Sequence, residues 1–347
     1  MSDELKTSLG MATGGAGGDA HEEAATYHSS LITHHSASVS VVVPSYNHAP
    51  FVERTLRSVF RQTHAPRELL VIDDGSRDGS ARVVGRVLRD CPFPCELIAR
   101  DNRGLCATLN EGFARTTGTY FAYLGSDDVW LPEFLRARVA ALEARPRAVL
   151  AYGGAYTVDE HDRVVDCTTG WARYADGDVR RMLMEILAPL SPTVLYRRAA
   201  LEGHRWNERA RLEDYEMYLR LSAAGEFAFE PRVLSAWRVH DHNASEDLEL
   251  MMRERLAAQT VVGPALGLSE EELGAYRALA RFRSAEEFIR RGRKRRAAGL
   301  ILSNPRGVPS ALAGARTLLK FLTPYRVLSW RRRRERERAF KRYGSLP

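Results

Sequence analysis

The sequence contains few cysteines and no long apolar run. Its 347 residues include four cysteines, which are too few and too unevenly spaced for a disulfide framework. No apolar stretch approaches the roughly 20 residues that a helix needs to span a bilayer. The first residues also lack the basic and apolar regions of a secretory signal peptide. These absences exclude the disulfide-rich and membrane-spanning classes, and they predict a cytoplasmic protein with free thiols that could still rest at the inner face of a membrane.

The composition is that of a folded protein whose charge is unevenly distributed. Hydrophobic residues make up 44% of the chain and the net charge is +7, with the positive charge concentrated in residues 250–347. The length suffices for one large core or two modest domains. We expect a disordered leader in residues 1–37, which are rich in small polar residues without periodicity. A globular domain should follow in residues 38–247, and then a basic helical region in residues 248–347.

Three short apolar runs each end abruptly in polar residues. Val39–Val43 is followed by Pro-Ser-Tyr-Asn-His, Leu69–Ile72 by Asp-Asp-Gly-Ser, and Tyr120–Leu124 by Gly-Ser-Asp-Asp. Apolar residues at helical spacing lie between the runs, and this alternation predicts an α/β fold with a mostly parallel, doubly wound sheet. Ligands of such sheets bind beyond the carboxyl ends of the strands. We therefore expect the three polar clusters to line one cleft.

Two adjacent carboxylates, Asp127 and Asp128, follow the third of these runs. Because burying an unpaired charge is costly, we expect them at the end of the strand, facing the cleft. Two hard oxygen ligands can hold a divalent cation that also grips a diphosphate, so the pair predicts a Mn²⁺ or Mg²⁺ site. The alternative is a solvated turn without a ligand.

Six motifs occur together in the part of the chain from residue 38 to about residue 246. They are Val-Val-Val-Pro-Ser-Tyr-Asn (41–47), Val-Ile-Asp-Asp-Gly-Ser-Arg-Asp-Gly-Ser (71–80), Asn-Arg-Gly-Leu-Cys-Ala-Thr-Leu-Asn-Glu-Gly (102–112), Gly-Ser-Asp-Asp (125–128), Leu-Glu-Asp-Tyr-Glu (212–216) and Trp-Arg-Val-His-Asp-His-Asn-Ala-Ser (237–245). Each motif alone is weak evidence, but in this order and spacing the sequence resembles a family 2 glycosyltransferase with the GT-A fold. The resemblance implies an enzyme that moves a sugar from a nucleotide-diphosphate sugar, most often a UDP-sugar, to a hydroxyl of a glycan or lipid-linked acceptor. Cell-surface glycan or polysaccharide synthesis is the expected role.

Residues 38–152 would form the nucleotide-binding half of such an enzyme. Tyr46 offers a flat face to a base, and a carboxylate such as Asp73 or Asp74 can accept hydrogen bonds from a uracil-type N–H or from ribose. A simple turn also explains Asp74-Gly75. The resemblance assigns donor binding to Pro44, Ser45, Tyr46, Asn47, Asp73, Asp74, Arg103 and Asp127. For Arg103, a solvated side chain is the alternative.

Gly125 stands where the family's Asp-x-Asp motif has its first acid. Of the two acids that remain, Asp128 is the expected metal ligand, and Asp127 is expected to make a ribose or bridging contact. His240 resembles the family's downstream histidine, which can approach the metal or the diphosphate. The alternative for His240 is a histidine that only completes its own hydrogen bonds.

Residues 153–247 would form the acceptor and catalytic half. Glu213 and Asp214 open a helix, where the helix dipole favours acidic side chains for stability alone. The resemblance instead makes Asp214 the general base that deprotonates the acceptor, with Glu213 supporting it or binding the acceptor. One base without a carboxylate nucleophile implies a single in-line displacement and inversion at the anomeric carbon. A retaining glycosidase would need a second carboxylate about 5 Å away across the bond.

Other functions fit the sequence less well. A sugar nucleotidyltransferase would need a glycine-rich, basic phosphate loop after the first strand, and Pro44–Asn47 offers none. A non-enzymatic alternative is a catalytically silent protein that binds nucleotide sugars or uses its basic tail for interactions. In that tail, aromatic residues such as Trp330 lead into Arg331–Arg334, a pattern typical of a helix on an anionic membrane surface. Contact with another macromolecule and a solvated end are the alternatives, and no nucleic acid is expected because no nucleic-acid-binding motif is present.

Overall fold

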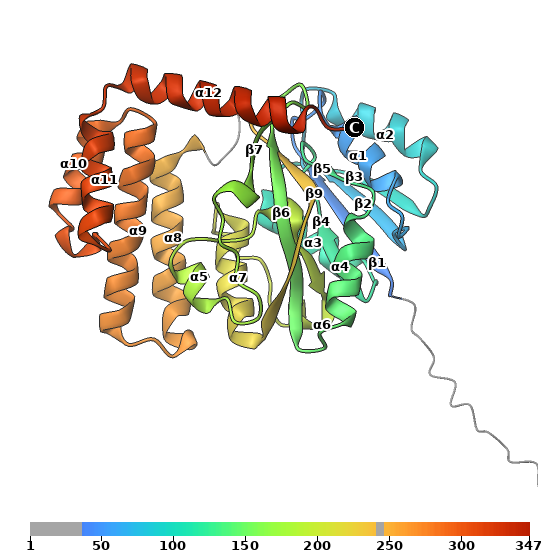
Figure 1. The fold of residues 1–347 in the computed structure, drawn as a ribbon. Helices are drawn as coiled ribbons and strands as arrows, with labels where there is room; N and C mark the ends of the chain where they lie inside the picture. Colours follow the sequence, from blue (N-terminus) through green and yellow to red (C-terminus); the bar gives the residue numbers. More distant parts are fainter. Residues whose placement is uncertain (1–36, 241–245) are drawn as a thin grey trace, which may run out of the picture. The chain divides into compact units, whose positions relative to one another are not determined.

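One β-sheet of nine strands organises residues 37–240 and 246–347, the parts of the chain that the computed structural model describes (Figure 1). The strands lie in the order β3-β2-β1-β4-β8-β6-β9-β5, and β7 pairs with β6. Their bounds are Val39–Ser45 (β1), Glu68–Asp73 (β2), Cys95–Ala99 (β3), Tyr120–Tyr123 (β4), Val129–Trp130 (β5), Ala148–Val158 (β6), Val164–Cys167 (β7), Leu195–Arg197 (β8) and Glu226–Arg238 (β9). β1 is parallel to β2 and β4, β2 to β3, and β6 to β9. The predicted α/β fold with a mostly parallel sheet is therefore confirmed.

Helices cover both faces of this sheet. Those that precede residue 240 are Val52–Phe60 (α1), Ser80–Val87 (α2), Leu105–Arg115 (α3), Phe134–Glu143 (α4), Arg180–Met184 (α5), Arg198–Leu201 (α6) and Glu213–Ala224 (α7). Apolar side chains of α1, α2 and α4 form one core with the sheet. Those of α3, α5 and α7 form a second core on the other face.

Adjacent residues of β1 face opposite sides of the sheet, as the two-residue period of a strand requires. Val42 lies in the core with α3 and α7, whereas Val41 and Val43 lie in the core with α1, α2 and α4. Because both faces are covered, the run is mainly apolar, with Ser40 as its one polar residue, rather than alternating. Gly112 lets α3 approach this strand closely, since a Cβ at that position would lie 2.7 Å from Val42.

A helical region follows the sheet in sequence and returns to it at the chain end. Its helices are Leu248–Val262 (α8), Glu270–Arg290 (α9), Lys294–Leu302 (α10), Ala311–Leu322 (α11) and Tyr325–Tyr343 (α12). α8, α9 and α10 share a core that includes Met252, Phe288 and Ala297. α12 leads back toward the sheet (Figure 1), where Leu346 packs with Val129 of β5 and Ala236 of β9.

The described residues do not separate the predicted domains. The described residues from 37 onward form one compact unit, so the boundary expected at residue 247 stays a prediction, although α8 begins directly after it. Residues 1–36 and 241–245 lie outside the described residues, and with them the predicted leader and the end of the Trp237–Ser245 motif. Among the described helices, none has both the length and the apolar character that crossing a membrane requires.

Candidate active site

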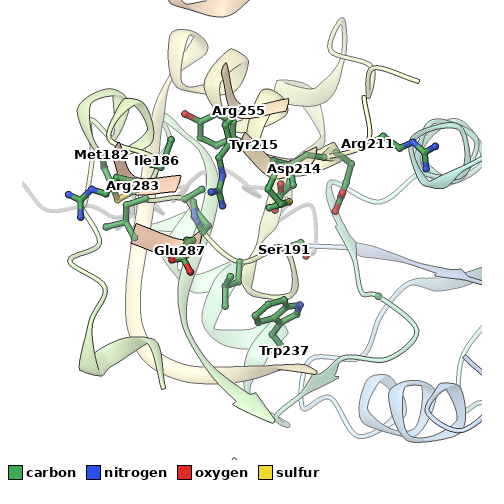
Figure 2. Close-up of a pocket in the computed structure, with 18 of the residues that line it drawn as sticks. Met182, Ile186, Ser191, Arg211, Asp214, Tyr215, Trp237, Arg255, Arg283 and Glu287 are labelled. Carbon is green, nitrogen blue, oxygen red and sulfur yellow. The ribbon is translucent and has the colours of Figure 1, made fainter. Parts of the chain in front are cut away.

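A cavity of about 1030 Å³ opens at the carboxyl ends of β1 and β4. α7 contributes its first residues to the wall, and α8 and α9 contribute side chains from the helical region (Figure 2). The predicted site residues that line the cavity are Pro44, Asp127, Asp128, Glu213, Asp214 and His240. Segments that are far apart in the sequence thus meet in one cleft.

The other predicted donor-binding residues are not among those that line this cavity, and they lie at the ends of β1 and β2 or in the loops after β1, β2 and β3. Asp74 is buried, and its carboxylate accepts hydrogen bonds from the backbone N–H groups of Arg103 and Gly104, both at 2.8 Å. The guanidinium of Arg100 also donates to it, and Asn102 donates to its backbone carbonyl at 2.8 Å. Asp74 therefore holds the loop that leads into α3. The structural alternative expected from the sequence was only a simple turn at Asp74-Gly75.

Asp73 and Asn47 join the first two strand-end loops. Asp73 accepts hydrogen bonds from the Ser45 hydroxyl at 3.3 Å and from the backbone N–H of Ser76 at 2.9 Å. Asn47 has a positive φ of 53°, and its side-chain oxygen accepts the backbone N–H of Arg77 at 2.9 Å. These bonds fix the β1 loop against the β2 loop.

Tyr46 and Arg103 are the exposed members of the predicted donor set. The Tyr46 side chain is half exposed, so its ring remains accessible to a flat ligand. Arg103 is more than half exposed and lies 3.6 Å from the Glu111 carboxylate. Because this ion pair is long and lies at the surface, the Arg103 side chain is accessible to a ligand as well.

Asp127 forms a cluster with two histidines. His240 lies with its Nε2 atom 3.1 Å from Asp127 Oδ2. His48 Nδ1 lies 3.7 Å from Asp127 Oδ1 and 2.8 Å from the Ser126 hydroxyl. Ligand atoms of His48, Asp127 and His240 all lie within 4.8 Å of one another, which is a spacing that suits a metal ion. The sequence analysis missed His48, although it directly follows the Pro44–Asn47 loop at the end of β1.

Asp128 points elsewhere. Its carboxylate accepts the backbone N–H of Arg238 at 2.8 Å, and its backbone carbonyl accepts the Thr55 hydroxyl at 2.7 Å. Burial and the neighbouring charge of Asp127 raise the pKa of Asp128 well above its usual value. A Cβ at Gly125 would lie 2.9 Å from Asp127 and 3.1 Å from Asp128, so a third acid at this position would crowd the pair.

Arg238, at the end of β9, ties this acidic turn to the rest of the fold. Its buried guanidinium donates to the backbone carbonyl of Asp127 at 2.8 Å and to that of Asp159 at 2.6 Å. It also pairs with the carboxylate of Asp162. The sequence analysis placed Arg238 within a motif but gave it no task, because its partners are about 80 to 110 residues away in sequence.

Glu213 and Asp214 lie at the start of α7 and titrate as a pair. Burial, followed by the charge of Asp214, raises the pKa of Glu213 to about 8. Burial raises the pKa of Asp214 to about 6, against the effects of nearby backbone N–H groups and of Arg255. The Tyr123 hydroxyl lies 3.3 Å from Glu213. At neutral pH the pair therefore carries mainly one negative charge.

Two tryptophans from residues 153–247 line the cavity. Trp171 is 51% exposed and Trp237 is partly buried, and both belong to the wall. Tyr174 instead packs against Tyr152 and Phe229 in the core. The residues between 153 and 211 thus supply both a cavity wall and a packing layer. The sequence alone did not separate these two roles.

Residues 40–204 match the sequence model of glycosyl transferase family 2. This part, just under half of the chain, is therefore similar to the catalytic domains of that family. An uncharacterized glycosyltransferase of Nostoc sp. is 29% identical over 168 residues, which cover 47% of this chain and 52% of the relative. Bacillus subtilis TuaG, described as a glycosyltransferase of teichuronic acid biosynthesis, is 31% identical over 107 residues, which cover 31% of this chain and 42% of TuaG. The chain spans about half to two thirds of the length of the first curated relatives that it matches.

Solved structures share the fold of this chain. S. aureus TarS 1–349, solved in complex with UDP, aligns with a TM-score of 0.53 and 18% identity over 86% of this chain and 91% of TarS. The mannosyltransferase PcManGT of Pyrobaculum calidifontis, solved with GDP-Man and Mn²⁺, aligns with a TM-score of 0.55 and 17% identity over 88% of this chain and 87% of PcManGT. At these identities the likeness concerns the fold alone, and it confirms the predicted GT-A type.

We expect an Asp74→Asn substitution to weaken the fold. An amide has one acceptor oxygen where the carboxylate has two, so it cannot keep the bonds to Arg103, Gly104 and Arg100 together. The free energy of unfolding in urea should fall by about 1–3 kcal/mol. Asp90→Asn, at an exposed acid, is the control and should change it by less than about 0.5 kcal/mol. Unchanged stability combined with lost nucleotide binding would return Asp74 to a donor-contacting role.

Proposed function

We propose that this chain is an inverting glycosyltransferase that moves a sugar from a nucleoside-diphosphate sugar to an acceptor hydroxyl. The observation that carries the proposal is that one cavity is lined both by the cluster around Asp127 and by the acidic pair Glu213–Asp214. The charge of Glu213 contributes to the raised pKa of Asp128, so the two acidic groups are within electrostatic reach of each other. A donor held at one group can thus meet an acceptor held at the other.

The donor and the acceptor class are proposed from chemistry and from the named relatives. UDP and GDP-Man bind in the two solved structures of the same fold, which supports a nucleotide sugar here and is compatible with the UDP-sugar expected from the sequence. A relative ascribed to teichuronic acid biosynthesis supports a glycan acceptor in polysaccharide synthesis. Trp171 and Trp237 offer flat apolar faces on which sugar rings can pack.

A divalent metal fits the cluster of His48, Asp127 and His240. One carboxylate and two imidazoles are softer than an all-oxygen set, so this donor set favours Mn²⁺ over Mg²⁺. When bound, the ion would neutralise the diphosphate and stabilise the leaving nucleoside diphosphate. The sequence favoured Asp128 as the ligand, but its carboxylate bonds to the backbone of Arg238. We therefore assign the metal to Asp127 and a positioning task to Asp128.

Asp214 is the proposed general base. Its pKa is raised to about 6, which leaves it ionised at neutral pH yet close enough to neutrality to take a proton effectively. Glu213 has its pKa raised to about 8, so it is mainly neutral at that pH and can donate a hydrogen bond. In-line attack of the deprotonated hydroxyl on the anomeric carbon would release the nucleoside diphosphate and invert the configuration.

Asp214→Asn should keep the size and the helix-capping ability of the side chain while removing its basicity. We expect kcat to fall by about 10²–10⁴-fold. The dissociation constant for UDP should change by a smaller factor. The wild-type kcat should rise with pH through about pH 6, because only the ionised base accepts a proton, and this rise should vanish in the variant. Glu216→Gln on the same helix is the control. Near-normal turnover of Asp214→Asn would move the base to Glu213, and UDP binding without any turnover by the wild type would favour a silent binding protein.

His48→Gln should weaken Mn²⁺ binding if the cluster holds the metal. We expect the dissociation constant, measured from the electron paramagnetic resonance signal of free Mn²⁺ in the presence of UDP, to rise at least about tenfold. His64→Gln is the matched control, because His64 bonds to the backbone of Ala37 outside the cluster. Unchanged affinity in His48→Gln, together with lost affinity in a folded Asp128→Asn, would restore the metal to Asp128.

A peripheral contact with an anionic membrane is a separate proposal for the helical region. α11 exposes Leu318, Leu319 and Leu322, each more than half accessible, and α12 exposes Trp330. The Arg331–Arg334 run continues α12, so apolar and basic side chains occur together as in helices that lie on anionic lipid. The positive charge of the α12 arginines is complementary to an anionic headgroup layer. We place the protein at the inner face of a membrane on this ground.

Replacing Leu318, Leu319 and Leu322 together by Ser should weaken cosedimentation with vesicles that contain phosphatidylglycerol. Deleting α12 is not a clean test, because Leu346 packs into the core beside β5 and β9. Binding of the wild type should fall as salt rises, since the attraction of basic residues to the surface is screened. Val261→Ser, at an exposed apolar residue of α8, is the control. Equal vesicle binding by all three proteins would assign α11 and α12 to solvent or to a protein partner.

A further inference from the structure

Four acidic side chains of the cavity wall, in residues 178–185 and in α9, form ion pairs with basic residues. Those that line the cavity are Asp178, Glu185, Glu286 and Glu287, and their partners are Arg180, Arg181, Lys320 and Arg290, respectively. These carboxylates are therefore not available to balance further positive charge on the wall. Of the other acids on the wall, Glu213 and Asp214 lie at the start of α7, while Asp127 bonds to His240 and Asp128 to the backbone N–H of Arg238.

Two arginines from the helical region face the cavity without such a partner. Arg255 of α8 and Arg283 of α9 line the wall, and within the described residues neither makes a hydrogen bond or an ion pair. Figure 2 shows both among the lining residues, with Arg255 beside Tyr215 and Asp214. Arg255 is partly buried, so a ligand that displaces its water must supply hydrogen-bond acceptors in return.

Arg255 also lies close to the proposed base. Burial raises the pKa of both Asp214 and Tyr215, and the charge of Arg255 opposes this rise, so the guanidinium is within electrostatic reach of the Asp214 carboxylate. A group bound by Arg255 would therefore lie near the hydroxyl that Asp214 deprotonates. The donor diphosphate is expected elsewhere, at the cluster of His48, Asp127 and His240.

We propose that Arg255 and Arg283 bind an anionic group of the acceptor, so that the acceptor is a glycan that carries phosphate or carboxylate groups close to the accepting hydroxyl. This inference rests on the proposed function, because it takes Asp214 as the base at that hydroxyl. A guanidinium presents parallel N–H donors that match both phosphate and carboxylate oxygens. A neutral glycan would leave these donors to water and would gain nothing from them.

The positions of the two arginines imply that the helical region, rather than the part that matches the family model, determines which acceptor is bound. Both lie beyond residues 40–204, the part that matches the family model, on helices that form the opposite wall of the cavity. The donor loops and the acidic turn belong to the matched part, and Glu213–Asp214 follow it closely. A shared catalytic domain is thus combined with a wall that selects the acceptor.

A binding experiment with matched charge removal tests this inference. The full chain is titrated calorimetrically with three soluble probes: hexagalacturonate, a hexamer of glycerol phosphate, and neutral maltohexaose. The same titrations are made with an Arg255→Gln/Arg283→Gln variant and with an Arg253→Gln/Arg281→Gln control. The control removes the same charge from the same two helices, at residues that do not line this cavity. UDP is titrated into all three proteins separately, with Mn²⁺ present.

We expect the wild type to bind at least one anionic hexamer and to bind maltohexaose at least about tenfold more weakly, since hydrogen bonds to charged groups contribute about 1.5–3 kcal/mol. The Arg255→Gln/Arg283→Gln variant should lose at least about tenfold in affinity for that hexamer, and the control should retain it. Preference for hexagalacturonate would assign a carboxylate, and preference for the glycerol phosphate hexamer a phosphate.

Three results would overturn the inference: no anionic probe binds the wild type, maltohexaose binds equally well, or both double variants lose the same affinity. Failure of the proposed function has a different signature. In that case UDP does not bind the wild type, or it binds and no sugar is ever released from a UDP-sugar. The anion site and the donor site are thus judged by separate readouts.

Discussion

The burial of acidic side chains at the carboxyl ends of the strands is the constraint on which the site depends. Asp127 and Asp128 are both nearly inaccessible, and an ionised carboxylate in such a place must have partners. The partners are Arg238, which bonds to the turn through its backbone and its guanidinium, and the two histidines beside Asp127. Because these partners come from the β1 loop and from the end of β9, the turn and its surroundings form one unit.

The helical region completes this unit rather than standing apart from it. Leu346 packs between strands that flank the acidic turn, while Arg255 and Arg283 face the cavity from α8 and α9. The chain end therefore connects the helical region to the strands that hold Asp127 and Arg238. The helices that form the far wall are positioned by a different apolar contact, because Ala258 and Val262 of α8 and Leu273 of α9 share a core with α7.

The strands and the positions of the polar clusters could be predicted from the sequence because they follow from local patterns. Mainly apolar runs such as Val39–Val43 are typical of strands covered on both faces, and acids directly after such runs must lie at the strand ends. The individual tasks of those acids could not be predicted this way. Asp74 and Asp128 look like ligands in sequence, yet both carboxylates are bonded to backbone N–H groups of distant residues.

The sequence by itself determined the α/β class, the family motifs and the acidic pairs, because each depends on residues close together in the chain. Only the tertiary structure decided which atoms meet. His48 and His240 are 192 positions apart in numbering, and a loop after β1 has to meet the end of β9 before they can share Asp127. Arg255 reaches the same cavity from a helix that the motifs do not include. Long-range packing sets these distances, and no local pattern encodes them.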